Sequence, residues 1–393
     1  MKILMLSPYI GSTYGGISKM VTELVKELGK QDLLLDLVTT NANDSKLLKV
    51  PCNVWIPEEN YRLQYFTSWN RNDLIISPSL IQWLFNHVTE YKLVHTHALF
   101  MPLVLLTHWV CQLHQIPYLM TPHGMLEPWA LSYKAWKKRY YHTLFDKPAL
   151  QRASAIQCLT SIEAQQIKAL GINSPTVVIP NGIHRKEFET LPSPDEFYQQ
   201  FPTTRNKDLI LFMGRIDPKK GLDLLASAFA KVQGQFPKTH LVVAGPDSIG
   251  FLPQAKRYFA EAGCINAVTF TGMLTGSIKS AALAAASCYV APSYSEGFSM
   301  SVLEGMAAGL PCVITTGCNF PEAATAQAAQ VVSPDAHAIA DALIQCLSQP
   351  EWSKQMGSRA RELIFQSYAW EKIANQLFRV YLSILTKENA IQS

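Results

Sequence analysis

Two carboxylates, Glu296 and Glu304, bracket a turn in which a predicted strand passes into a predicted helix. The strand is expected to end at residues 289–292, and the helix to run over residues 301–308. The turn is expected over residues 295–299. Because the first N–H groups of a helix lack intrahelical partners and the helix dipole favours negative charge there, the turn predicts an anion site that would fit a diphosphate.

Each glutamate also has a purely structural interpretation. Ser301 and Glu304 are spaced as in a capping box, so Glu304 could serve only to hold the start of the helix. Glu296 has no capping partner at the right spacing, and its alternative is a solvated loop charge. It follows a strand at the place where open α/β sheets bind ligands, which favours a functional role.

A second cluster of candidate residues is cationic. Residues 208–216 read as a strand that ends with Gly214 and Arg215, and Lys219 and Lys220 precede a helix that begins near Gly221. Positive charge at this end of a helix is opposed by the helix dipole, so a bound anion that compensates both is expected. The alternative, an ordinary surface lysine, fits Lys219 better than Arg215.

A glycine turn follows the first predicted strand. It has Gly11 and Gly16 at the spacing of a phosphate-binding P-loop, but Ile17 stands where that motif requires lysine, so a Walker-type triphosphate site is excluded. Gly15 and Gly16 would still let the backbone approach a ligand closely. A plain tight turn remains the alternative.

Histidines follow or end two further predicted strands. His123 comes directly after residues 116–121, and such a histidine is more often a structural hydrogen-bonding residue than a catalytic one. His95 and His97 lie on one predicted strand over residues 93–97, and His95 is expected on the opposite side of it from His97. His95 is expected to be structural, whereas His97 fits either a core or a cleft-lining position.

Together these motifs resemble the retaining glycosyltransferases of family 4, which have the two-domain GT-B fold. The resemblance is carried by Gly214-Arg215 before Lys220-Gly221 and by the seven residues between Glu296 and Glu304. Further motifs of the same family occur in order at residues 14–18, 94–97, 121–124, 178–183 and 369–374. The resemblance therefore covers nearly the whole chain.

The resemblance implies a role for each candidate residue. In the family, Glu304 holds the nucleotide ribose, Glu296 contacts hydroxyls of the transferred sugar, and the histidine at His123 lies close to that sugar. The glycine turn faces the donor diphosphate across an interdomain cleft. The implied donor-binding residues are Gly15, Gly16, Asn181, Gly214, Arg215, Lys220, Glu296, Gly297, Phe298, Ser299, Met300 and Glu304.

The implied reaction breaks a bond between sugar and phosphate. Negative charge then develops on the departing diphosphate, so catalysis chiefly needs fixed cations and amides. The catalytic set is expected to be His123, Glu296, Arg215 and Lys220. No D-x-D sequence occurs in the chain, which predicts a transfer that uses no metal and no cofactor. Retention of anomeric configuration is implied by the family alone.

Composition favours a two-domain α/β protein. The 393 residues are 48% hydrophobic and 16% charged, and strand and helix patterns alternate, as in doubly wound parallel sheets. We expect a Rossmann-like acceptor-binding domain over residues 1–185, a linker over 186–207 and a Rossmann-like nucleotide-sugar domain over 208–368. The amphipathic residues 369–393 are implied to form a helix that crosses back to the N-terminal domain.

The chain is expected to work in the cytoplasm. Its eight cysteines show no C-x-x-C pair and read as reduced core residues. Residues 1–10 read as a strand rather than as a signal peptide. Residues 93–126 lack Asp, Glu, Lys and Arg, but histidines and prolines interrupt them, so a buried strand, helix and strand is preferred to a membrane span.

Residues 129–145 interleave basic and aromatic side chains and are the candidate for acceptor or membrane contact. The basic side chains considered for the acceptor side are Lys137, Lys138 and Arg139, with His97 as a weaker candidate. An anionic membrane surface at the inner face of the plasma membrane, or a lipid-linked acceptor, would suit this segment. A helix packed by its aromatic side chains is the alternative. A net charge of +4 without a binding motif argues against nucleic acid.

Three functions remain open. The first is transfer of a hexose from a UDP- or GDP-sugar to a saccharide or lipid-linked acceptor, in cell-surface polysaccharide or glycolipid synthesis. The second is a sugar-nucleotide epimerase of the same fold, against which the two glutamates with Arg215 and Lys220 weigh. The third is a non-catalytic sugar-nucleotide-binding subunit. The sequence does not reveal the nucleotide base or the sugar of the donor, nor the acceptor.

Overall fold

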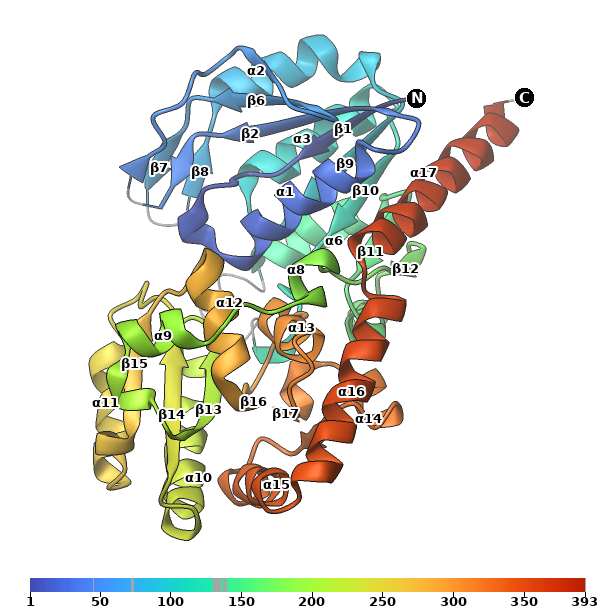
Figure 1. Ribbon diagram of the computed structural model, residues 1–393. Coiled ribbons are helices and arrows are strands. Elements are labelled where there is room, and N and C mark those ends of the chain that lie inside the picture. Colours follow the sequence, from blue (N-terminus) through green and yellow to red (C-terminus); the bar gives the residue numbers. More distant parts are fainter. Residues whose placement is uncertain (45, 72–73, 130–135, 137–139, 393) are drawn as a thin grey trace. The chain divides into compact units, whose positions relative to one another are not determined.

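The computed structural model describes residues 1–44, 46–71, 74–129, 136 and 140–392. The chain divides into two compact units, each built from strands and helices (Figure 1). The first unit contains residues 1–182 together with 370–393, and the second contains 183–369. The mixed α/β, two-domain fold expected from the sequence is therefore confirmed.

The first unit is built on a parallel sheet. Its described strands have the order β12-β11-β10-β9-β1-β2-β6-β5, in which only β5 runs antiparallel to its neighbour. The strands of this sheet are β1 (Lys2–Leu6), β2 (Leu34–Thr40), β5 (Trp55–Pro57), β6 (Arg62–Phe66), β9 (Leu93–His97), β10 (Tyr118–Thr121), β11 (Ala155–Cys158) and β12 (Thr176–Val178). Two short antiparallel pairs are β3 (Ala42–Asn43) with β4 (Lys46–Leu47) and β7 (Trp69–Arg71) with β8 (Leu74–Ile76). Central strands such as β1 and β9 are buried because helices cover a parallel sheet on both faces.

Helices connect the strands of the first unit. They are α1 (Gly16–Leu28), α2 (Pro78–His87), α3 (Pro102–Leu113), α6 (Lys147–Gln151) and α7 (Ser161–Ala169), with the single-turn or π-helical segments η1 (Ser12–Tyr14), η2 (Val88–Glu90) and η3 (His142–Asp146). The uncharged stretch over residues 93–126 thus folds as β9, α3 and β10, as expected. No helix among the described residues is long and apolar enough to cross a membrane.

The last helix, α17 (Trp370–Gln392), belongs to the first unit and packs against α1 (Figure 1). Its buried face carries Trp370, Ile373, Leu377 and Tyr381, which join the hydrophobic cluster formed by α1 and the neighbouring strands. The apolar spacing of the sequence thus produced the predicted helix, and its return to the N-terminal domain is confirmed.

A buried hydrogen bond fixes α17 to the sheet. The hydroxyl of Tyr381 lies 2.6 Å from Nδ1 of His95, and Nε2 of His95 lies 2.8 Å from Oγ1 of Thr121. Both His95 and Tyr381 are fully buried. His95 is therefore structural, as expected. Its expected place on the opposite side of the strand from His97 is wrong, because residues two apart share one face of a strand, and the centroids of the two rings lie 4.3 Å apart.

Removing this hydrogen bond should loosen α17. We expect Tyr381→Phe to lower the free energy of unfolding by about 1–3 kcal/mol, because Nδ1 of His95 would stay buried without a partner. Urea denaturation followed by tryptophan fluorescence measures the effect. Ser383→Ala is the matched control, since this exposed residue of the same helix bonds only to the carbonyl of Val380. Equal stability of Tyr381→Phe and wild type would contradict the assignment.

The second unit is also built on a parallel sheet, with the order β15-β14-β13-β16-β17-β18. Its strands are β13 (Asp208–Met213), β14 (Thr239–Ala244), β15 (Val268–Gly272), β16 (Ala286–Ala291), β17 (Cys312–Thr315) and β18 (Gln330–Val332). The strand order reverses between β13 and β16. In open α/β sheets, such a switch point leaves a crevice at the carboxyl ends of the two strands.

Helices cover this second sheet. They are α8 (Lys186–Glu189), α9 (Asp195–Gln200), α10 (Leu222–Gln235), α11 (Leu252–Glu261), α12 (Gly276–Ala285), α13 (Met300–Ala307), α14 (Pro321–Thr325), α15 (Ala336–Ser348) and α16 (Pro350–Ser367). Single turns are η4 (Pro202–Thr204), η5 (Pro218–Lys220), η6 (Ile265–Ala267) and η7 (Thr316–Cys318). All eight cysteines are free, and most of them are buried, as expected for core residues.

Residues 186–207 are not an extended linker. They contain α8, α9 and η4 and belong to the second unit. Phe188 and Phe197 anchor them, because both side chains are buried. Pro192 and Pro194 lie between α8 and α9, whereas Pro202 begins η4 and many of the polar residues belong to the helices themselves.

Candidate functional site

The strongest candidate residues meet at the switch point of the second sheet. Strand β13 ends at Met213 and its neighbour β16 ends at Ala291, with Leu211 paired to Tyr289. The loop after β13 carries the predicted cations, and the loop after β16 carries Glu296. Because the carboxyl ends of parallel strands lie at one edge, residues that are 76 positions apart come into contact.

Glu296 and Lys220 form a buried ion pair at this edge. Glu296 is 7% exposed and Lys220 is 9% exposed. The hydroxyl of Ser293 donates a hydrogen bond to the same carboxylate oxygen at 2.7 Å. A solvated loop charge, the structural alternative for Glu296, is therefore excluded.

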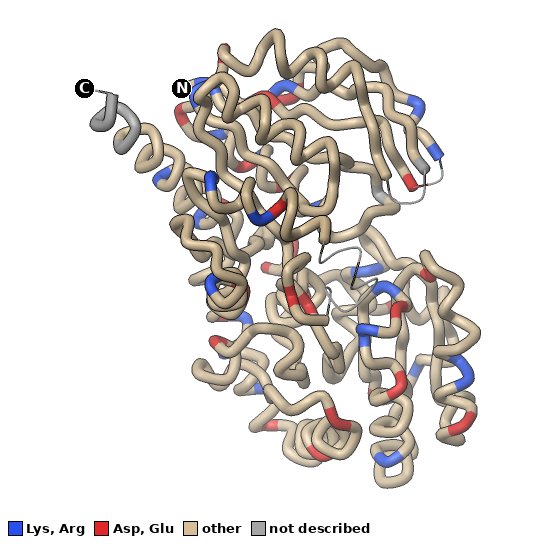
Figure 2. The backbone as a smooth tube through the Cα atoms, turned by 180° about the vertical axis from the view of Figure 1, so that it is seen from behind, with Lys and Arg blue, Asp and Glu red and all other residues tan. Residues whose placement is uncertain are grey.

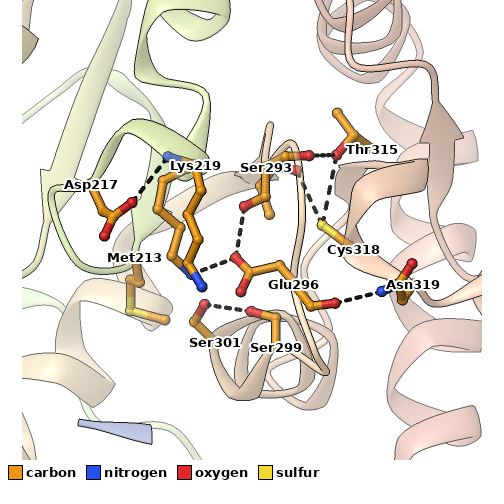
Figure 3. Close-up of polar contacts among 12 residues, drawn as sticks. Met213, Asp217, Lys219, Ser293, Glu296, Ser299, Ser301, Thr315, Cys318 and Asn319 are labelled. Atoms are coloured by element: carbon orange, nitrogen blue, oxygen red, sulfur yellow. Dashed lines mark hydrogen bonds and ion pairs between the residues drawn. The ribbon is translucent and has the colours of Figure 1, made fainter. Parts of the chain in front are cut away.

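The backbone of Glu296 is fixed as firmly as its side chain. Its N–H donates to the carbonyl of Gly317 at 2.8 Å, and its carbonyl accepts from Nδ2 of Asn319 at 2.6 Å (Figure 3). Asn319 and Gly317 come from the loop after β17. Three successive strands thus position one carboxylate, which is the arrangement of a preorganised site.

The charges around Glu296 do not cancel. Burial by itself would raise the pKa of Glu296, but Lys220 and Lys219 together with the two side-chain hydrogen bonds outweigh it and hold that pKa below its ordinary value. Burial lowers the pKa of Lys219, opposed by Glu296 and assisted by Lys220 and Arg215. Arg215 is exposed on the same loop. Three cations, Lys219, Lys220 and Arg215, thus act in this group beside two carboxylates, those of Glu296 and Asp217, and the excess of positive charge favours a further anion.

Gly221 couples the cationic loop to the glutamate loop. It has a φ of 68°, which favours glycine, and a Cβ at this position would lie 2.0 Å from the carbonyl oxygen of Pro292. The carbonyl of Lys219 also accepts the N–H of Tyr294 at 2.8 Å. The turn that presents Lys220 is thus pressed directly against the turn that presents Glu296.

A side chain at position 221 should destabilise the contact between these two turns. We expect Gly221→Ala to lower stability by more than about 2 kcal/mol, because a left-handed φ and a backbone clash must both be relieved. Gly234→Ala on the same helix is the control, because a Cβ there meets nothing within 4 Å. The control should instead gain about 0.5–1 kcal/mol from helix propensity. Thermal unfolding compares the two variants. Similar melting temperatures for Gly221→Ala and Gly234→Ala would refute the close contact between the turns that present Lys220 and Glu296.

Helix α13 begins at Met300, so its first amides lie beside this ion pair and lack intrahelical acceptors. Ser299 is the N-cap residue, and no side chain caps the helix. The capping-box alternative for Glu304 is wrong, because the helix begins one residue earlier than predicted. A carboxylate of Glu304 instead accepts a hydrogen bond from Nζ of Lys279 at 2.9 Å, with both side chains largely buried.

Lys279 was not found by sequence reasoning. It lies on α12, 25 positions before Glu304, and nothing in its own segment distinguishes it from a surface lysine. Its charge balances Glu304 as Lys220 balances Glu296. Gly214 completes this edge, since its N–H donates to the carbonyl of Ala244.

The remaining predicted residues lie in the first unit. Gly15 has a φ of 70° and precedes the first residue of α1, Gly16. A Cβ at either glycine would meet nothing within 4 Å, so open space lies in front of this helix start. Asn181 is buried in the loop after β12.

Two of the predicted histidines are in contact. Nδ1 of His97, at the end of β9, lies 3.1 Å from Nε2 of His123, in the turn after β10. Burial lowers the pKa of His123 to about 3 and that of His97 well below its ordinary value. Both imidazoles are therefore neutral near pH 7. A neutral ring at His123 can donate or accept a hydrogen bond but carries no charge.

The basic residues proposed for acceptor or membrane contact, Lys137, Lys138 and Arg139, lie outside the described residues. Beside them, Trp136 and Tyr140 are exposed. Lys and Arg elsewhere are dispersed along the backbone among Asp and Glu (Figure 2). Across the described part of the chain, no group of three or more His, Cys, Asp or Glu is placed to hold a metal ion.

Two family models match the chain. The model described as "Glycosyl transferases group 1" matches residues 194–363, and that described as "Glycosyltransferase Family 4" matches residues 14–187. A phosphatidyl-myo-inositol mannosyltransferase of Mycobacterium leprae is 29% identical over 232 residues, which are 58% of this chain and 58% of that protein. This chain thus spans little more than half the length of that relative.

Other relatives cover more of the chain. A mannosylfructose-phosphate synthase of Agrobacterium fabrum is 23% identical over 340 residues, 77% of this chain and 71% of that protein. A sucrose-phosphate synthase from Thermosynechococcus elongatus superposes with a TM-score of 0.79 at 22% identity over 98% of this chain and all of that one. An Anabaena protein, HepE, bound to UDP and glucose, superposes with a TM-score of 0.77 at 18% identity over the same shares. At these identities the solved structures establish the fold.

Proposed function

Because this chain belongs to the group 1 glycosyltransferases of family 4, we propose that it moves a hexose from a nucleoside diphosphate sugar to a saccharide or lipid-linked acceptor. The observation that carries the proposal is the buried pair of Lys220 and Glu296 at the switch point of the second sheet. A sugar bound there would lie against the carboxylate, and its diphosphate against the cations.

In this proposal the diphosphate binds between Arg215, Lys220 and the first amides of α13. These groups are fixed before the substrate arrives, so they stabilise the charge that develops on the leaving group without reorganisation. Glu304, held by Lys279, binds the ribose hydroxyls. Glu296 accepts hydrogen bonds from hydroxyls of the transferred hexose and remains ionised, because its pKa is held low.

The proposal also gives roles to residues of the first unit. His123, as a neutral imidazole, would hydrogen-bond the transferred sugar, with Nε2 directed at His97. The open space before Gly15 and Gly16 would admit the donor diphosphate, and Asn181 would help to bind the donor. His97 would orient His123 rather than touch substrate.

We propose that the transfer is retaining and needs no metal. The cations and amides of the second unit supply the charge that a bound metal would otherwise provide. The chain also lacks the D-x-D sequence by which many transferases hold a metal-bound diphosphate. Activity in the presence of EDTA tests this point, and the anomeric configuration of the product tests retention.

The donor is proposed to be a UDP- or GDP-hexose and the product a cell-surface polysaccharide or glycolipid. Support comes from similar proteins: Anabaena HepE binds UDP-glucose, and the mycobacterial relative is a phosphatidyl-myo-inositol mannosyltransferase. We propose a cytoplasmic protein that contacts the inner face of the plasma membrane through residues 129–145. Nucleic acid is not a proposed partner.

Two alternatives remain: an epimerase of the same fold, and a sugar-nucleotide-binding subunit without activity. To separate them, the protein is incubated with radiolabelled UDP- and GDP-hexoses and a lipid and saccharide extract, with and without EDTA. The proposal predicts label in an acceptor, with the anomeric configuration of the donor. Label only in a changed hexose on the nucleotide would indicate the epimerase, and binding without turnover would indicate the subunit.

A further inference from the structure

The turn that presents His123 has an unusual backbone. His123 has a φ of 58° and Gly124 a φ of 72°, so two successive residues are in the left-handed region. For a residue with a side chain this conformation costs roughly 1 kcal/mol or more. Such a turn persists only where the surrounding structure holds it.

A buried carboxylate holds this turn. Oε1 of Glu163 accepts the N–H of Gly124 at 2.6 Å, and Oε2 accepts the N–H of Leu159 at 2.6 Å. Glu163 is 1% exposed. Strand β10 pairs with β11 in parallel, so the turn after β10 and the loop after β11 are neighbours at one sheet edge. Glu163 therefore bridges the two loops, one carboxylate oxygen to each.

Helix capping does not account for this arrangement. Thr160 is the N-cap residue of α7, and its hydroxyl accepts the N–H of Glu163 at 3.0 Å, which is half of a capping box. In a full capping box the glutamate would return to the N–H of Thr160. Both oxygens of Glu163 are instead used outside the helix, and one reaches a residue 39 positions away.

The ring of His123 is held by a different group. Its Nε2 faces Nδ1 of His97 at 3.1 Å, and the two rings are stacked with centroids 5.3 Å apart. His97 thus limits the rotation of the imidazole, while Glu163 fixes the backbone from which it projects. His97 lies at the end of β9, and Glu163 lies on α7, the helix that follows β11.

We propose that Glu163 is a positioning residue for His123: it holds the turn after β10 in the left-handed conformation that aims the imidazole. Its role in turnover rests on the proposed function, in which His123 hydrogen-bonds the transferred sugar. Loss of Glu163 would leave His123 chemically intact but misdirected. Because a small misplacement of a catalytic group is costly, we expect kcat to fall by about tenfold or more with KM little changed.

The test compares Glu163→Gln with Thr160→Ala. Glutamine keeps one acceptor oxygen but turns an NH₂ group toward the other backbone N–H, so the bridge breaks on one side. Thr160→Ala weakens the cap of the same helix by about 1 kcal/mol and leaves the bridge in place. If Glu163 only caps α7, the two variants should behave alike.

The first readout needs no substrate. In protein labelled with ¹⁵N-histidine, the imidazole signals of His123 are assigned from the His123→Asn variant. We expect these signals to shift in Glu163→Gln and to stay in place in Thr160→Ala. Unchanged signals in Glu163→Gln, or equal shifts in both variants, would overturn the proposal. If Glu163→Gln does not fold, Glu163→Asp carries the test, because its shorter side chain cannot span both amides.

The second readout is turnover of the nucleotide sugar by the same variants. We expect a lower kcat for Glu163→Gln and unchanged kinetics for Thr160→Ala below its melting temperature. Unchanged kcat in Glu163→Gln, together with shifted signals, would refute the positioning role in catalysis. If wild type turns over no donor, the proposed function fails, whereas the imidazole signals still decide whether Glu163 positions His123.

Discussion

Replacing Lys220 by methionine should lower kcat/KM for the nucleotide sugar by about 10²- to 10³-fold, because a fixed cation beside the leaving diphosphate is removed. The same change leaves the buried carboxylate of Glu296 without its ion-pair partner. Breaking a buried pair on one side costs about 3 kcal/mol or more of folding stability. Steady-state kinetics and urea denaturation measure the two effects separately.

A double variant distinguishes catalysis from folding. Lys220→Met with Glu296→Gln removes both charges, so most of the lost stability should return while turnover stays lost. Lys231→Met serves as the control, because Lys231 forms an exposed pair with Asp341 and should change stability by less than about 1 kcal/mol. Wild-type kcat/KM in folded Lys220→Met, or turnover recovered in the double variant, would refute the role of Lys220.

The first unit should lose stability on mild acidification. Burial lowers the pKa of His95, His108 and His123 to about 3 and that of His97 well below its ordinary value. At pH 5 these rings bind no proton in the folded unit, whereas each binds one in the unfolded chain, where the pKa is near 6.5. Unfolding therefore takes up protons, and stability falls as the pH drops below about 6.5.

Two buried carboxyls act in the opposite direction. Burial raises the pKa of Glu163 and of Asp146 to about 7, with hydrogen bonds from the backbone opposing it in each case. Near pH 5 both are protonated in the folded unit and mostly ionised in the unfolded chain, so their contribution to stability rises as the pH falls. Near pH 5 the four histidines take up about four protons on unfolding and the two carboxyls release about two. The net uptake of about two protons corresponds to roughly 3 kcal/mol of stability lost per pH unit.

Hydrogen exchange followed by mass spectrometry between pH 7 and pH 5, corrected for the intrinsic pH dependence of exchange, measures this loss. Peptides from β9 and β10 should lose protection, and peptides from β13 and β14 in the second unit should lose less. His108→Gln is the control, because it removes one buried ring and should reduce the slope by about 1.4 kcal/mol per pH unit. Equal protection of β9 and β10 at both pH values would contradict neutral, buried histidines.

Much of the site was predictable because its residues end or follow strands. Alternating strand and helix patterns predicted two parallel sheets, and the short loops after their strands limit where Lys220 and Glu296 can lie. The contact between these two residues follows from the reversal of strand order between β13 and β16. Strand order itself was supplied by the structure.

The residues that escaped prediction act through contacts distant in sequence. Lys279 and Glu163 stand on helices whose own patterns are ordinary, and their partners lie 25 and 39 positions away. Spacing also misled locally, since Ser301 and Glu304 match a capping box that the helix does not form. Residues 186–207 resembled a linker in sequence. In the structure they form short helices, which the buried side chains of Phe188 and Phe197 hold against the second unit.

The most direct test of the account is release of nucleoside diphosphate from UDP-, GDP- and ADP-hexoses by the purified protein, with EDTA and the acceptor extract present. Wild type is compared with Glu296→Ala and Arg215→Ala. Wild type should release the diphosphate from one donor, and both variants should lose this release. No release from any donor, together with no binding of free UDP, GDP or ADP in a calorimetric titration, would contradict it.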